Sequence, residues 1–89
     1  MTQQEHFRKV NQLLEEALDE NKSMDEKYWR TSAYANALGA LIGEFNNRET
    51  FKFMLEIQEK IYESSKKSYG NECVILATIA ALGDVLGSR

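Results

Sequence analysis

The chain has 89 residues, a net charge of −3, one cysteine and no proline. A chain of this length suits one domain with a small core, and the absence of proline favours helices over linkers. The weak negative charge gives no general attraction to nucleic acid, and one cysteine excludes an intrachain disulfide. The longest apolar run, residues 73–83, is shorter than the roughly 20 residues of a membrane span. We therefore expect a single soluble, cytoplasmic domain over residues 1–89, with no signal peptide, membrane span or nucleic-acid partner.

The first predicted helix covers residues 3–20. Thr2 and Glu5 have the spacing of a capping box, in which each side chain bonds the backbone N–H of the other residue. Apolar residues then recur at three- and four-residue spacing, which predicts one buried stripe. The stripe consists of Phe7, Val10, Leu13, Leu14, Ala17 and Leu18.

The second predicted helix covers residues 24–45 and begins at a second capping-box pattern, Ser23 with Glu26. Residues 31–43 carry no charge. A helix that is apolar all round is covered on several sides, so we expect this helix near the centre of the fold.

The third and fourth predicted helices cover residues 48–68 and 72–87. Asn46 or Asn47 can cap the third helix, and Gly70 suits the turn that precedes the fourth. The fourth helix is again apolar on almost every side. These patterns predict an all-α fold of four antiparallel helices, arranged as two helical hairpins.

The motif Ala-Leu-Gly-x-x-x-Gly occurs twice, at residues 37–43 and 81–87. A shift of 44 residues aligns the two copies and also aligns Phe7 with Phe51 and Glu15 with Glu59. Glycine inside a helix costs about 1 kcal/mol relative to alanine. Its presence at matching positions suggests a packing reason, such as the close approach of a neighbouring helix. The pattern is compatible with stacked hairpins of an internal repeat or with a closed four-helix bundle.

The repeated pattern resembles tetratricopeptide repeats, in the longer-period variety found in kinesin light chains. The matching features are Leu38-Gly39, the turn at Asn46-Asn47, residues 56–72 and Leu82-Gly83, and the resemblance covers roughly residues 5–89. It implies stacked hairpins with an inner groove that takes a partner helix or a basic peptide. The implied lining of that groove is Ala33, Asn36, Ala40, Glu44, Ala77, Ala80 and Asp84.

No residue pattern points to catalysis. His6 has no second histidine or cysteine nearby in sequence, so we interpret it as a solvated side chain and predict no metal site. We interpret Cys73 as a small buried residue, since no motif implies a histidine partner for it. The glycines do not form a phosphate-binding loop. We therefore predict no catalytic residue, no cofactor and no enzymatic activity.

Tyr28, Trp29, Arg30 and Tyr34 form the most unusual cluster in the sequence. Two interpretations stay open. Trp29 and Tyr34 can be core residues, or the cluster can be an exposed patch, because Trp, Tyr and Arg are enriched at the centres of interfaces. Arg30 with the aromatic rings could also hold a nucleotide or another phosphate-bearing ligand.

The apolar fourth helix suggests self-association, because we expect part of its surface to face water in a four-helix arrangement. A two-fold dimer is the simplest way to cover it. The candidate residues are Val74, Thr78, Leu82 and Val85.

These features favour a small adaptor or regulator that binds a protein partner and self-associates. The alternatives are a protein that binds or sequesters a nucleotide signal, and a structural subunit of an assembly.

Overall fold

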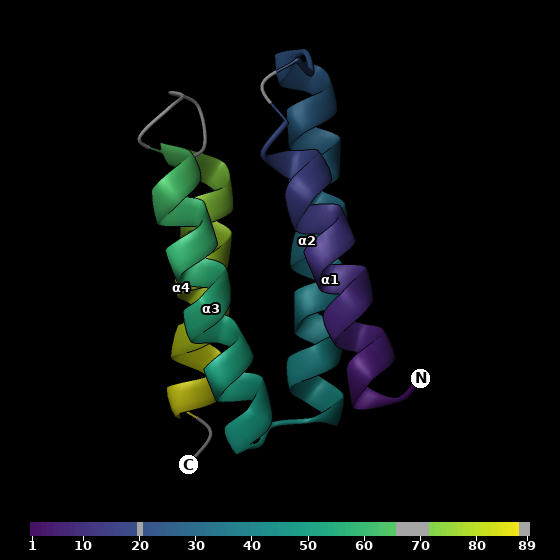
Figure 1. Cartoon of the computed structure of the whole chain (residues 1–89), viewed down its shortest axis with the longest axis vertical. Helices are drawn as coiled ribbons and strands as arrows, with labels where there is room; N and C mark the ends of the chain where they lie inside the picture. The colour runs from purple at the N-terminus through teal and green to yellow at the C-terminus, as the bar shows by residue number, and fades with distance from the viewer. Residues whose placement is uncertain (20, 66–71, 88–89) are drawn as a thin grey trace.

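The computed structural model describes residues 1–19, 21–65 and 72–87, with all their side chains except those at 24, 65, 72, 73 and 84–87. In these ranges the chain forms four α-helices and no strand, which confirms the all-α fold class. The helices are α1 (Gln3–Ala17), α2 (Met24–Glu44), α3 (Arg48–Ser65) and α4 (Glu72–Gly87) (Figure 1). The predicted end of the third helix at 68 and the turn at Gly70 lie outside the described residues.

Local hydrogen bonds explain where the first three helices begin. Thr2 and Glu5 form the predicted capping box, with N–H to side-chain oxygen distances of 3.0 and 3.2 Å. The Ser23 hydroxyl accepts the N–H of Glu26 at 3.3 Å. Of the two candidate caps for α3, Asn47 accepts the N–H of Thr50 at 3.1 Å. Side-chain oxygens therefore satisfy backbone N–H groups that the helices themselves leave unpaired.

Helix α1 ends at Ala17, so the predicted end at residue 20 was wrong. The Leu18 N–H still bonds the Leu14 carbonyl, but the Asp19 carboxylate then accepts the N–H of Asn21 at 2.9 Å. Aspartate competes for nearby backbone N–H groups in this way and so favours a turn over another helical turn. The predicted end of α2 at residue 45 is one residue beyond the observed end at Glu44.

The four helices form two hairpins that lie side by side. Helix α1 pairs with α2, and α3 pairs with α4 (Figure 1). Helices α1 and α3 run in the same direction along the long axis, and α2 and α4 run together in the opposite direction. Within the part of the chain that the structure describes, the arrangement is therefore a stack of two hairpins with corresponding helices parallel.

Polar contacts between the hairpins join residues at similar positions in each. The Gln3 side-chain amide donates to Asn47 at 2.8 Å and to Thr50 at 3.1 Å, and these partners are 44 and 47 residues away. The Lys60 ammonium group lies 3.2 Å from the Glu15 carboxylate, at a separation of 45 residues. The parallel helices are thus almost in register. The predicted repeat has the same spacing, and its relationship to tetratricopeptide repeats stays a prediction.

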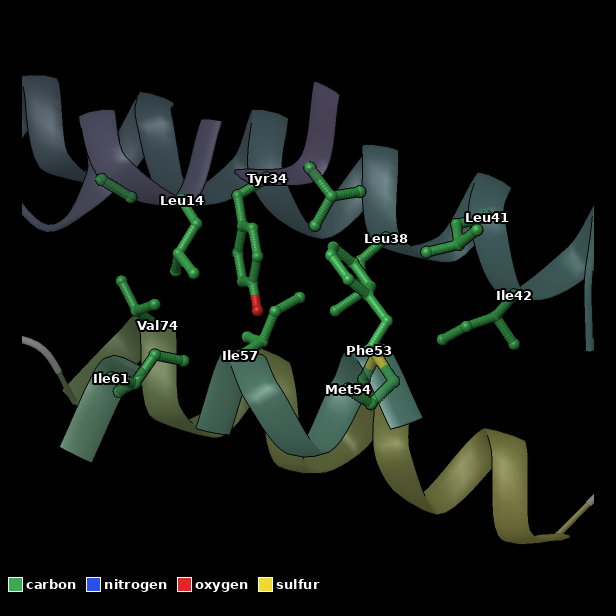
Figure 2. Packing of buried hydrophobic residues seen from close by; sticks show 12 residues of the cluster. Leu14, Tyr34, Leu38, Leu41, Ile42, Phe53, Met54, Ile57, Ile61 and Val74 are labelled. Carbon is green, nitrogen blue, oxygen red and sulfur yellow. The ribbon is translucent and has the colours of Figure 1, made fainter. Parts of the chain in front are cut away.

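The hydrophobic core is a layer between the two hairpins (Figure 2). Leu14 from α1 and Tyr34 and Leu38 from α2 point towards Ile57 and Val74 of the second hairpin. Phe53 of α3 also belongs to the core, and its ring stacks on that of Phe7 of α1, with centroids 4.3 Å apart. The buried core residues are Val10, Leu14, Ala17, Tyr34, Leu38, Leu41, Ile42, Phe53, Met54, Ile57, Ile61 and Val74.

Tyr34 is the largest fully buried side chain, and its hydroxyl bonds that of Thr78 across the hairpin interface. The Thr78 hydroxyl donates its own hydrogen to the Val74 carbonyl, at 2.8 Å. The Tyr34 hydroxyl is therefore the donor in the bond between the two side chains. Thr78 is the partner that makes burial of the tyrosine hydroxyl tolerable, because an unpaired buried hydroxyl costs about 1–3 kcal/mol.

This direction of donation predicts unequal effects of two substitutions. Thr78→Val should lower the free energy of unfolding by about 1–3 kcal/mol, because the Tyr34 hydroxyl loses its acceptor. Tyr34→Phe should cost less, because Thr78 keeps its bond to Val74. In the double variant, the added Tyr34→Phe should recover part of the loss. Urea unfolding of the four proteins measures these energies, and simple additivity would contradict the assignment.

The same burial predicts a stability loss at alkaline pH. Desolvation raises the pKa of Tyr34 from 10.0 to about 12, against a smaller lowering by the Thr78 bond. Above pH 10 the unfolded chain loses the Tyr34 proton while the folded chain keeps it. The free energy of unfolding should therefore fall, by up to about 1.4 kcal/mol per pH unit, between pH 10 and 12. Urea titrations at several pH values measure this free energy. It should fall less steeply with pH in Tyr34→Phe than in the original protein. Equal slopes for the two proteins would argue against Tyr34 as the cause.

Candidate interaction site

The α3–α4 hairpin carries large exposed apolar side chains. Tyr62 is 60 % exposed, Leu76 66 % and Ile79 53 %. Residues 74–83 of α4 contain no charged side chain. We call the surface formed by Tyr62, Leu76 and Ile79, with the pocket between them, the outer face. Contiguous exposed apolar surface of this kind marks interaction sites in soluble proteins.

A pocket of about 210 Å³ opens between α3 and α4 on the outer face. Its walls are mostly apolar, and the polar residues among them are Gln58, Tyr62 and Thr78. The lining residues are Gln58, Ile61, Tyr62, Ile75, Thr78 and Ile79. A pocket of this size can take one or two side chains of a partner rather than a drug-sized ligand, for which pockets are typically about 300–1,000 Å³.

Of the residues predicted for self-association, only Thr78 touches this surface, as part of the pocket lining. Val74 is 2 % exposed and Thr78 is fully buried, because both point towards α2 in the core. Leu82 is half-buried against the same core, and the side chain of Val85 lies outside the described residues. The exposed apolar residues of α4 are instead Leu76 and Ile79, on another face of the helix. Self-association through α4 stays a prediction, and burial within one chain makes Val74 and Thr78 poor candidates for it.

The predicted cluster of Arg30 and aromatic residues is divided between the core and the surface. Tyr34 is buried, whereas Tyr28 is 62 % and Trp29 is 70 % exposed. The Tyr28 and Trp29 rings meet edge to face, with centroids 5.7 Å apart. The Arg30 guanidinium lies 3.1 Å from the Glu16 carboxylate of α1. The core interpretation therefore holds for Tyr34 and was wrong for Trp29.

A shallow groove of about 450 Å³ runs between α2 and α4. Its lining is Ala35, Gly39, Ile42, Gly43, Ala77, Ala80 and Ala81. Of the predicted lining only Ala77 and Ala80 are present. Asn36 is exposed elsewhere on α2, Glu44 is directed to α1, and the side chain of Asp84 lies outside the described residues. The predicted and observed linings differ on α2 because this helix presents a different row of residues to α4 than the prediction assumed.

His6 is buried, so its interpretation as a solvated side chain was wrong. It is 6 % exposed, and its Nε2 lies 2.9 Å from the Glu44 carboxylate at the end of α2. The imidazole N–H donates, because a carboxylate oxygen can only accept. The ring edge also packs against Phe45, with centroids 5.7 Å apart. His6 therefore fastens the start of α1 to the end of α2, and it occupies one oxygen of a residue predicted to bind a partner.

Comparisons of the chain with protein families, with curated proteins and with solved structures find no match. In the described ranges, no three His, Cys, Asp or Glu side chains come together in a group that could hold a metal ion. No helix in these ranges combines the length and the apolar character needed to cross a membrane. The site is therefore interpreted from its own geometry.

Three glycines of the repeated motif, Gly39, Gly43 and Gly83, have open space where a side chain would begin. A methyl group added at Gly39, Gly43 or Gly83 would meet no atom within 4 Å, so the expected close approach of a neighbouring helix is absent. Gly39→Ala and Gly83→Ala should each raise the free energy of unfolding by about 0.4–1 kcal/mol, because alanine has less freedom to lose on folding. Chemical denaturation measures this. Ala40→Gly, beside Gly39 on the exposed side of α2, is the matched control and should destabilise the fold by a similar amount.

Proposed function

We propose that this protein is a helical protein–protein interaction module, an adaptor or regulator rather than an enzyme. The outer face of the α3–α4 hairpin would be its docking surface. The observation that carries the proposal is the exposure of Tyr62 and Ile79, which line a pocket, and of Leu76 on the same helix as Ile79. A partner that covers these side chains gains about 25 cal/mol for each Å² of apolar surface removed from water.

The form of the outer face suits a helical partner. Residues of α3 and of α4 line a pocket that can receive an anchoring side chain. Amphipathic helices dock in such apolar grooves through residues spaced three or four apart. The parallel stacking of the two hairpins supports the same proposal, since stacked hairpins build extended binding surfaces in helical repeat proteins.

The alternative hypothesis, a nucleotide-binding protein, has less support. It required Tyr34 beside Arg30 and the other aromatic rings, whereas the Tyr34 hydroxyl bonds Thr78 in the core. The Arg30 guanidinium already has the Glu16 carboxylate as a partner. Tyr28 and Trp29 remain as an exposed edge-to-face pair, which is a smaller platform than the predicted cluster.

Site-specific photo-crosslinking tests the docking surface. Benzoylphenylalanine in place of Ile79 should give covalent adducts of defined mass in cells that produce the protein. Ile79 is 53 % exposed, so the larger side chain should be accepted without unfolding, and circular dichroism checks this. A second substitution, Leu76→Glu, should remove most of the adduct, because it places a charge in the centre of the apolar surface.

The matched control carries the same photoreactive residue at Gln12, which is exposed on the polar side of α1. Position 79 should give several times the adduct yield of position 12. Equal yields at the two positions, or an adduct that persists unchanged with Leu76→Glu, would rule out the outer face as the docking surface.

A further inference from the structure

We propose that the start of α2 is a second docking surface, on which the rings of Tyr28 and Trp29 receive a lysine or arginine side chain from a basic segment of a partner protein. We call Asp25, Tyr28 and Trp29 the aromatic surface. It belongs to the first hairpin and shares no residue with the outer face, so the inference goes beyond the proposed function.

The two rings are already held together in water. Trp29 has the largest exposed fraction of the large apolar side chains that the structure describes, and Tyr28 is also mostly exposed. Their rings meet edge to face, which is a favoured arrangement for aromatic pairs. The face of an aromatic ring attracts the ammonium group of lysine and the guanidinium group of arginine, and tryptophan attracts them most strongly.

The charge of the chain favours a basic partner at this place. Residues 15–30 contain six carboxylates and three cations, whereas the rest of the chain contains eight of each. The whole negative excess of the chain therefore lies in the segment that spans the end of α1 and the start of α2 (Figure 1). Of the three cations, Lys22 lies 3.7 Å from the Glu26 carboxylate. A local negative excess attracts basic segments and repels acidic ones.

The other two cations are also engaged, whereas a carboxylate beside the rings is available. The Arg30 guanidinium lies 3.1 Å from Glu16, and Lys27 is only 8 % exposed. Asp25 is exposed, and no ion pair joins it to another of the described residues. It precedes the two rings by three and four residues, which places the three side chains on one face of the helix. A cation on the Trp29 ring therefore has a carboxylate beside it, and a phosphate does not have a free cation.

Trp29 is the only tryptophan of the chain, so the fluorescence of the full chain reports on this surface. The probes are capped peptides in which glycine alternates with arginine, with serine or with glutamate. The arginine peptide should change the emission of Trp29 in a saturable way, with a dissociation constant at least about tenfold below those of the other two. Equally tight binding of the serine peptide would indicate an apolar partner, and of the glutamate peptide an acidic one. Either result would overturn the proposal.

A substitution of Asp25 tests the charged part of the surface. Asp25→Asn should weaken binding of the arginine peptide by about two- to fivefold, which is the effect of one exposed charged contact. Glu59→Gln is the matched control, because it removes an exposed carboxylate from α3, and it should bind like the original chain. Circular dichroism checks that both variants keep their helices. An unchanged affinity in Asp25→Asn, an equal loss in both variants, or no saturable change with the arginine peptide would contradict the basic partner.

Discussion

The apolar layer between the two hairpins is the contact on which the rest of the structure depends. A chain of 89 residues buries little surface, and neither hairpin encloses a core by itself. Stacking brings the apolar rows of all four helices into one layer, with Tyr34 across its middle (Figure 2). The bond from Tyr34 to Thr78 belongs to the same layer and ties the position of α2 to that of α4.

Polar contacts around this layer select one alignment of the helices. Hydrophobic burial has little directional preference, so it tolerates a sliding of one hairpin along the other. The bonds from Gln3 to Asn47 and from Lys60 to Glu15 join α1 and α3 near their opposite ends, and His6 joins α1 to Glu44 of α2. An exposed pair such as Lys60 and Glu15 stabilises a protein by only about 0–1 kcal/mol. The main effect of these contacts is therefore on register.

The exposed apolar residues of the second hairpin connect the fold with the proposed function. Stacking buries the core residues of both hairpins in one layer and leaves other side chains of each in contact with solvent. On the first hairpin these include Tyr28, Trp29 and the ion pair of Arg30 and Glu16. On the second hairpin Tyr62, Leu76 and Ile79 are exposed. Exposed apolar side chains beside a pocket support a surface for a partner.

The sequence by itself determined the number of helices and the residues at which the first three begin, because caps such as Thr2 and Ser23 act within one helical turn. It left open whether Tyr34 belongs to the core or to an exposed cluster. Only the tertiary structure decided which row of each apolar helix faces a neighbour. That choice depends on the rotation and pairing of whole helices, and α2 and α4 have apolar residues on too many sides for periodicity to reveal it. Trp29 is therefore exposed, His6 is buried beside Glu44, and Leu76 and Ile79 of α4 form the candidate surface.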